Sequence, residues 1–537
     1  MVCRVAPLLS RVVQRYGKWR LAFAFFLLAY ALLLLLYLDY APIRWDETPH
    51  LYGGLVLNNG QFDDYLRESS FYPPLFDIVT AFFFRLFGVS LFSARLVAVT
   101  FGVLSVWTIF EYALRFYGRR TALISSVLLS SMPGFIILCR MAAIETMLLF
   151  FFTLSLLLFF SWMRAHNDKT LLLSGLILGL GFLVKYQALV AGIIMLASIL
   201  FFCRRHLAIK LNKFFIMLIF AGAVVVPWIV VIYQKYASGM LGNWFYVILM
   251  GNEERLVYST RFPTPIFYLI EMTQPYPHIH PIYFPIFFTS LLGLGLWLWR
   301  RREEDKFSLL TFFGVYLVFT LIISKDWRYV TLVFPILAVS ASEFILFLWD
   351  KAKDRLRTPH ISFRKKNIIK VTAAVLVLVV SLSVIYSSWE SYLWTERDHI
   401  YIPIGEATHY VADRTTLNEK IVVLCAGNYF SADMVEFYLL MSNPNREQPI
   451  QYPELPADTY TLNFNVTWLI ENATASNVKY LMLYEQGNIT YFKSELLAHD
   501  VLEIMLDTKQ FVFETEFGSF PRRIFIIWFL PNLEEIE

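Results

Sequence analysis

The chain has 537 residues, of which 58% are hydrophobic, 18% aromatic and only 16% charged, and its net charge is +4. Soluble domains average about 25% charged residues, so most of this chain must face something other than water. Several runs approach or exceed the roughly 18 apolar residues of a membrane-spanning helix, which predicts a polytopic α-helical membrane protein. The four cysteines are too scattered for a disulfide framework or a CxxC metal site: Cys3, Cys139, Cys203 and Cys425.

Taken in chain order, the apolar runs predict about eleven spanning helices, separated by short polar connections. We place them at 20–39, 93–114, 120–139, 143–163, 170–184, 187–203, 213–234, 282–299, 307–324, 329–349 and 368–388. The stretch 73–87 is excluded, because it contains Asp77 and Arg85 and covers only roughly 22 Å at 1.5 Å per residue. The hydrocarbon core is roughly 30 Å thick, so we interpret 73–87 as an interfacial or re-entrant helix on the outer face.

Lysine and arginine set the orientation, because cytoplasmic loops carry their excess. The basic segments fall on one side of the membrane only if 73–87 does not cross: 1–20, 115–120, 204–213, 300–306 and 351–370. This places the N-terminus in the cytoplasm and everything from about residue 389 outside the cell membrane. Three glycosylation sequons, at Asn465, Asn472 and Asn488, agree with an exterior tail.

The tail differs from the rest in composition. Strand-like runs such as "KIVVLCAG" and "RRIFIIWFL" alternate with helix-like ones such as "SADMVEFYLLM", a pattern that indicates a small α/β domain. We therefore predict a membrane domain over 1–388 and a C-terminal extracytoplasmic α/β domain over 389–537.

The first outer loop opens with an acidic pair, Asp46 and Glu47, in "RWDETPHLY" at 44–52. Thr48 as N-cap and Pro49 at the first helical position predict a short helix that ends at "NNG", 58–60. The two acids either complement the positive end of that helix or carry a function.

Other charged residues gather at the predicted outer corners, where they are costly near membrane depth and therefore become functional candidates. Each has a structural alternative. Glu145 can form a salt bridge with Arg140, Lys185 can snorkel to the surface, and Lys325 and Arg328 can serve as interface anchors.

Two further features stand in the outer loops. His278 and His280 share one face of an extended "HIH", so they either bind a metal or only line their loop, and we favour the second interpretation. Tyr72 precedes a double proline that favours an extended backbone, and contact with a substrate stays open. Because the middles of the spans are nearly all apolar, the pattern favours chemistry at the outer interface over transport, which places polar residues near mid-membrane.

Five motifs in chain order resemble the GT-C type membrane glycosyltransferases, specifically protein O-mannosyltransferases and the lipid A aminoarabinose transferase. They are "RWDETPHLYGG", "FYPPLFDIVTAFFFRLFGVSLFSARL", "RFYGRRTALISSVLLSSMPGFIILCRMAAIETMLLFFFTLSLLL", "LGLGFLVKYQAL" and "SKDWRYVTLVFPILAV". The resemblance covers about residues 20–350, and the loop 235–281 matches only loosely.

The resemblance implies transfer of a sugar from a polyprenyl- or dolichyl-phosphate carrier to a hydroxyl of a protein or lipid acceptor, with no nucleic-acid partner. It implies a catalytic role for Asp46, with Glu47 beside it, and matches Glu145 to the acid of the next outer corner. The residues expected to bind substrate are Tyr72, Arg140, Lys185, Lys325, Arg328 and Tyr329. A Glu-Lys pair of the aminoarabinose enzyme is replaced here by Phe71 and Tyr72, so a metal or phosphate contact at that place is not carried over.

The chemistry implied by this family assigns the residues to roles. The acceptor hydroxyl needs a base, for which we choose Asp46, and direct displacement would invert the anomeric carbon. Glu47 and Glu145 would orient the acceptor or a bound divalent cation. Two alternatives stay open: an oligosaccharyltransferase-like subunit, although the tail lacks its "WWDYG"-like element, and a non-catalytic polyprenyl-phosphate carrier or flippase.

Overall fold

The computed structural model describes residues 18–68, 72–202, 206–249, 258–275, 280–357, 401–424, 430–452, 463–488 and 490–531, with isolated residues between 367 and 386. The chain forms two compact units. The first, which we call the helical unit, contains Met1–Leu36, Leu66–Phe76 and Arg95–Trp394. The second, which we call the sheet unit, contains Tyr37–Tyr65, Asp77–Ala94 and Thr395–Glu537.

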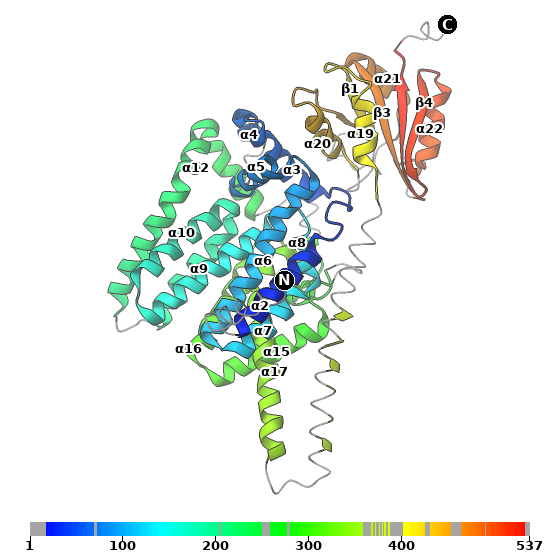
Figure 1. Cartoon of the computed structure of the whole chain (residues 1–537). Coiled ribbons are helices and arrows are strands. Elements are labelled where there is room, and N and C mark those ends of the chain that lie inside the picture. The colour runs from blue at the N-terminus through cyan, green and yellow to red at the C-terminus, as the bar shows by residue number, and fades with distance from the viewer. Residues whose placement is uncertain are drawn as a thin grey trace, which may run out of the picture. The chain divides into compact units, whose positions relative to one another are not determined.

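The helical unit contains most of the long apolar helices (Figure 1). Its elements in chain order are α2 (Lys18–Leu35), α6 (Leu91–Phe116, whose first turn belongs to the sheet unit), α7 (Arg119–Ser130), α8 (Pro133–Cys139), α9 (Glu145–Ala165), α10 (Asp168–Val184), η2 (Tyr186–Ala188), α11 (Leu189–Phe202), α12 (Leu207–Leu249), η4 (Thr264–Ile266), α14 (Phe267–Glu271), α15 (Phe284–Arg300), α16 (Glu303–Leu321), η5 (Trp327–Val333) and α17 (Phe334–Arg357).

Four helices of the described chain are long and apolar enough to cross a membrane: Leu91–Phe116, Glu145–Ala165, Leu207–Gln234 and Trp327–Arg355. The pair α7 and α8 adds a fifth candidate that is bent by 70°, where the sequence predicted one uninterrupted helix over 120–139. Met132 adopts an extended backbone before Pro133, because a residue before proline is driven out of the helical region. The predicted spans from 20–39 to 329–349 coincide with helical segments, and 368–388 lies mostly outside the described residues.

Small residues let neighbouring helices of this unit approach closely. A Cβ atom on Gly175 of α10 would lie 2.3 Å from the carbonyl oxygen of Met217 in α12, and one on Gly179 would lie 2.6 Å from that of Ala221. These glycines stand four residues apart on one face of α10, the small-xxx-small spacing that allows close helix contacts in lipid. Without that contact α10 would lose its packing against α12.

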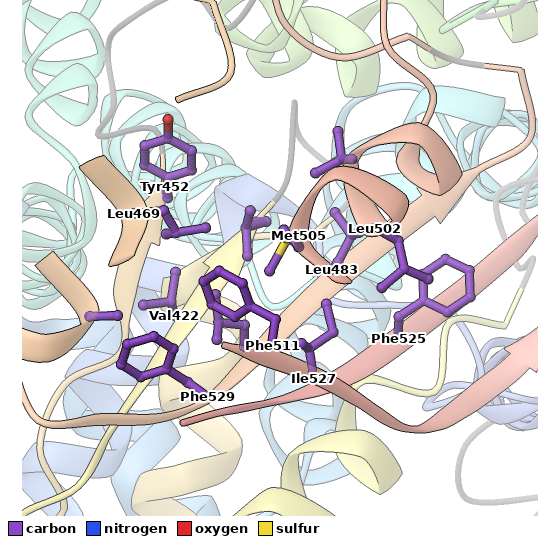
Figure 2. Close-up of a cluster of buried hydrophobic side chains, with 14 of the residues drawn as sticks. Val422, Tyr452, Leu469, Leu483, Leu502, Met505, Phe511, Phe525, Ile527 and Phe529 are labelled. Atoms are coloured by element: carbon purple, nitrogen blue, oxygen red, sulfur yellow. The ribbon is translucent and has the colours of Figure 1, made fainter. Parts of the chain in front are cut away.

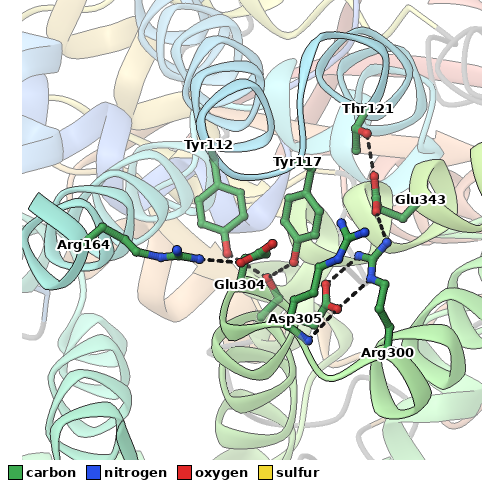
Figure 3. Close-up of polar contacts among 10 residues, drawn as sticks. Tyr112, Tyr117, Thr121, Arg164, Arg300, Glu304, Asp305 and Glu343 are labelled. Carbon is green, nitrogen blue, oxygen red and sulfur yellow. Dashed lines mark hydrogen bonds and ion pairs between the residues drawn. The ribbon is translucent and has the colours of Figure 1, made fainter. Parts of the chain in front are cut away.

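A polar network joins helices at the end of the bundle where the basic segments lie (Figure 3). Arg300 donates to Asp305 (2.6 and 2.8 Å) and to Glu343 (2.7 Å), whose other oxygen accepts from Thr121 at 2.6 Å. Arg164 pairs with Glu304. The basic segment 300–306 is therefore a structural link between α7, α9, α15, α16 and α17.

The sheet unit begins with the loop that the sequence predicted to face outward, which forms η1 (Trp45–Glu47), α3 (Thr48–Asn58), α4 (Phe62–Glu68, which ends in the helical unit) and α5 (Leu75–Phe87, which begins there). The predicted helices after "TP" and over 73–87 are α3 and α5. The N-cap of α3 is Glu47 and not Thr48, and Glu47 makes no side-chain capping bond. The chain leaves α3 through Gly60, whose φ of +78° suits glycine.

The C-terminal part of the sheet unit is an α/β fold, as the sequence predicted (Figure 1). Its elements are α19 (Ile404–Ala412), β1 (Lys420–Leu424), α20 (Ala432–Ser442), β2 (Ile450–Tyr452), α21 (Val466–Ala475), β3 (Val478–Gln486), α22 (Ala498–Asp507), β4 (Phe511–Ser519) and β5 (Arg522–Phe529). The strand order is β2-β1-β3-β5-β4, parallel across β2, β1 and β3 and antiparallel at β5 and β4. The predicted domain boundary at 389 lies outside the described residues.

An apolar core holds α21 and α22 against one face of this sheet (Figure 2). Leu469 of α21 and Met505 of α22 meet Leu483, Phe525 and Ile527 of the strands. In the same unit α20 packs against α3, and the rings of Tyr40 and Tyr401 stack at 5.7 Å. The loop that carries α3 and the C-terminal fold are therefore joined by direct packing.

Candidate active site

A buried ion pair occupies the junction of α9, α10 and η2. Glu145 is the first residue of α9 and only 5% exposed, and the positive end of the helix favours its carboxylate. Its Oε1 lies 3.2 Å from Nζ of Lys185, which interrupts the helix between α10 and η2 with an extended backbone. Glu145 therefore pairs with Lys185 and not with Arg140, the local partner considered from the sequence.

The second carboxylate oxygen of Glu145 has a different environment. Oε2 is buried and has no hydrogen-bond partner among the residues that the structure describes. A buried acceptor without a partner costs about 1–3 kcal/mol, so this oxygen is suited to accept a hydrogen bond from a bound molecule.

Aromatic and basic groups surround Lys185. Its Nζ lies 5.5 Å from the ring centroid of Tyr329, within cation–π range, and Tyr72 and Arg328 interact with it electrostatically. Burial is the largest single effect and disfavours the charged lysine, but the Glu145 carboxylate together with Tyr72 and Tyr329 outweighs it, so the pKa of Lys185 is raised. Lys185 therefore stays a cation in this partly dry environment.

The turn η5 holds Arg328 next to this pair. Asp326 caps η5 by accepting from the backbone N–H of Arg328 at 2.9 Å, and the guanidinium donates to both of its carboxylate oxygens, at 2.8 Å from Nη2 and 3.1 Å from Nε. Arg328 also interacts electrostatically with Glu145. The fork geometry of Arg328 fixes its planar cation in one orientation.

Lys325 lies just before this turn in a different setting. Its ammonium donates to the carbonyl of Ile322 at 2.9 Å, where α16 ends, and it lies 6.0 Å from the ring centroid of Phe267. Lys325 is 6% exposed and has no acidic partner in the described part of the chain. Burial lowers its pKa. It therefore caps a helix end as well as carrying the charge that the sequence assigned to phosphate binding.

A buried acid in the long loop 235–281 was not foreseen from the sequence. Glu271 is fully buried and accepts hydrogen bonds from Tyr258 and Arg261, and burial raises its pKa. This loop matched known motifs only loosely, and the sole signal was an acid inside the apolar run "FYLIEM".

The predicted metal ligands are only partly described. Nδ1 of His280 donates to the carbonyl of Thr273 at 3.0 Å, and His278 lies outside the described residues. Within the described ranges, no three His, Cys, Asp or Glu side chains cluster in a way that could hold a metal ion.

The remaining predicted residues occupy separate places. Arg140 follows α8 and donates to the carbonyl of Leu34 at the end of α2 (2.8 Å). Asp46 and Glu47 belong to the sheet unit. Glu47 is fully buried and its Oε2 accepts from the backbone N–H of Arg44 at 2.9 Å, whereas Asp46 is exposed.

The helical unit thus brings Glu145, Lys185, Arg328, Tyr329 and Tyr72 into one electrostatic cluster, which we call the Glu145–Lys185 cluster. The predicted convergence of Asp46 on the same site stays a prediction. The bundle, the cluster of charges at its helix ends and the mixed C-terminal sheet define a multi-pass helical membrane protein with a charged site and a C-terminal α/β fold.

Comparison with known proteins narrows this class. Residues 72–231 match the model of the dolichyl-phosphate-mannose-protein mannosyltransferase family, which confirms the resemblance predicted from the motifs. An uncharacterised protein of Aquifex aeolicus is 25% identical over 284 residues, which are 51% of this chain and 52% of that protein. The chain therefore spans about half the length of this curated relative.

Solved structures agree in fold. ArnT from Cupriavidus metallidurans, in the apo state, superimposes with a TM-score of 0.61 at 14% identity, over 94% of this chain and 98% of that one. The same enzyme bound to undecaprenyl phosphate gives 0.59 at 14% identity, with the same coverage. The archaeal oligosaccharyltransferase AglB from Archaeoglobus fulgidus, in complex with an inhibitory peptide and a dolichol-phosphate, gives 0.53 at 14% identity, over 88% and 69%. The chain has an ArnT-like fold.

Proposed function

We propose that this protein is an inverting glycosyltransferase that moves a sugar from a polyprenyl-phosphate carrier to an acceptor hydroxyl at the outer face of the cell membrane. The observation that carries the proposal is the Glu145–Lys185 cluster, in which two partly buried cations and two partly buried tyrosines lie around a buried carboxylate in an ArnT-like fold. The relative bound to undecaprenyl phosphate supports the same class of donor for this chain.

The donor is a phosphodiester with one negative charge, and its phosphate gains a second charge as the bond to the sugar breaks. Lys185 and Arg328 are each balanced by one carboxylate, so the incoming phosphate would share cations that are already held in place. Such preorganised charges stabilise developing charge more strongly in a partly dry site than in water. Lys325 would add a cation that no described acid neutralises.

The acceptor oxygen must lose its proton as it bonds to the anomeric carbon. We assign Asp46 as the base that takes this proton, while the bond from carbon to phosphate oxygen breaks and the carrier leaves as polyprenyl phosphate. The exposure of Asp46 supports this role. Glu47 is buried against the backbone of Arg44, which supports a role in shaping the loop, and Oε2 of Glu145 is suited to orient a hydroxyl of the acceptor or of the sugar.

The test is to incubate the purified protein with polyprenyl-phospho-sugars and acceptor, and to measure released polyprenyl phosphate. Wild-type protein should release it and Asp46→Asn should lose about 10²–10⁴-fold in rate, with donor still bound. Asp63→Asn, an exposed acid of the same loop, is the matched control and should keep its rate. Donor binding without release by the wild type would favour the carrier alternative and refute the proposal.

A further inference from the structure

Three polar side chains from three helices meet in the interior of the sheet unit. The imidazole of His50 in α3 donates from Nδ1 to Oδ1 of Asp77 in α5 at 2.8 Å, and the hydroxyl of Tyr65 in α4 donates to Oδ2 at 3.0 Å. These side chains are all at least nine-tenths buried, with exposures of 4% for His50, 1% for Asp77 and 0% for Tyr65. We call this group the His50–Asp77–Tyr65 clasp.

Two glycines in α3, Gly53 and Gly54, leave the space in which the clasp forms. A Cβ atom on Gly53 would lie 2.8 Å from Oδ2 of Asp77, and one on Gly54 would lie 2.6 Å from Cγ2 of Thr80. Contacts this short do not occur for real side chains, so the Gly-Gly pair is required for α3 to lie so close to α5. Since His50 stands three and four residues before these glycines, all three share one face of α3.

Holding α3 and α5 together through the clasp requires the burial of a carboxylate, which is energetically unfavourable. A carboxylate removed from water costs several kcal/mol unless it is fully hydrogen-bonded, and apolar residues of the same volume would pack α3 on α5 without that cost. What the clasp adds is direction: Tyr65 of α4 holds one oxygen of Asp77 in place, and the hydrogen bond from His50 to the other oxygen limits the rotation of α3 about its axis as well as its distance from α5.

The rotation of α3 matters because of what precedes it. Glu47 is its N-cap and Asp46 lies one residue earlier, so His50 follows Asp46 by one helical turn. The same helix also packs against α20. A helix held by two neighbouring helices presents the residues at its N-terminus in one fixed geometry.

We propose that His50, through Asp77 and Tyr65, is a positioning residue that fixes the acidic pair for the acceptor. This inference rests on the proposed function, in which Asp46 is the base. A misplacement of a reacting group by about 1 Å costs roughly 10²-fold in rate, so loss of the clasp should lower kcat while KM for the polyprenyl donor changes little, because the donor contacts belong to the helical unit.

The experiment compares His50→Phe, which keeps a ring but removes the nitrogen donor, with Val56→Ala, which removes packing from the same helix (Val56 is 3% exposed) without touching the clasp. Full-length proteins are purified, and kcat, KM, thermal unfolding and hydrogen exchange of the segment 44–52 are measured. His50→Phe should lower kcat roughly 10²-fold and speed exchange at 44–52, whereas Val56→Ala should lower thermal stability with kcat nearly unchanged.

A second comparison tests whether His50 acts through Asp46. In an Asp46→Asn background His50→Phe should cause no further loss, since residues that act through one another are not additive. If His50→Phe does not fold, Tyr65→Phe removes one hydroxyl and should give about a tenfold loss. A wild-type kcat in a folded clasp variant, or equal losses in both backgrounds, would overturn the inference. If the wild type transfers no sugar but the clasp variants still show faster hydrogen exchange at 44–52, the proposed function is refuted, whereas the role of the clasp in fixing this segment is supported.

Discussion

Replacing Lys185 by methionine removes the cation that neutralises Glu145 while keeping a side chain of similar length. The two charges lie 3.2 Å apart, with side-chain exposures of 15% for Lys185 and 6% for Glu145. At an effective dielectric constant of about 20, their attraction is about 5 kcal/mol. Breaking a buried pair by removing one partner costs about 3–5 kcal/mol, because the other charge stays buried without compensation. Lys185→Met should therefore lower the free energy of unfolding by about 3–5 kcal/mol.

The double variant Glu145→Gln with Lys185→Met separates stability from function. It removes both charges, and replacing a whole buried pair is often neutral or stabilising, so most of the lost stability should return. Transfer activity should not return, because the phosphate has lost a cation. The assay is thermal or chemical unfolding in one detergent together with release of polyprenyl phosphate. A double variant as unstable as the single one, or a single variant as stable as wild type, would refute this reasoning.

Three further outcomes follow from the structure. Glu47→Gln should lower the thermal midpoint because it weakens the hydrogen bond that Glu47 accepts from the backbone N–H of Arg44, but it should cost less activity than Asp46→Asn. A larger kcat loss in Glu47→Gln than in Asp46→Asn would assign the role of the base to Glu47. At the polar network, Arg300→Met leaves the buried carboxylates of Asp305 and Glu343 without their shared cation. It should destabilise the protein by about 3–5 kcal/mol, with KM for the donor unchanged. Full stability of this variant would contradict the reasoning, and exposed Arg301→Met is the control. Burial lowers the folded-state pKa of Lys325, so the unfolded chain binds this proton more tightly. Stability should therefore rise with pH from that lowered pKa towards the ordinary value of 10.5. Lys325→Met should flatten that rise in a pH series of unfolding curves.

The helices were largely predictable because lipid imposes a simple rule, that a crossing segment must be long and apolar. The α/β tail was predictable for a related reason, since strands and helices bury apolar residues with different periods. The bend before Pro133 was not taken into account, although the proline stood in the sequence. The N-cap of α3 was placed one residue late, at Thr48 instead of Glu47, because capping preference favours threonine and the chain turns earlier here.

The polar partners were harder, because they are set by tertiary packing and not by local spacing. For Glu145 the sequence suggested Arg140, five residues before it, whereas the structure pairs it with Lys185, forty residues away. Asp77 was used only as a sign that 73–87 does not cross, and its bonds to His50 and Tyr65 were not foreseen. Such pairs depend on which helix faces meet, which a single sequence does not encode in any short motif.

The packing of α3 against α20 has a consequence for how the protein is made. About 370 residues of chain lie between the end of α3 at Asn58 and the start of α20 at Ala432, and at roughly 5–20 residues per second the ribosome needs roughly 20–75 s to bridge them. Throughout that interval the loop with Asp46 has no access to its later partner. The loop can therefore complete its packing only after α20 has been synthesised, so that a chain interrupted before α20 would carry an unfinished first loop.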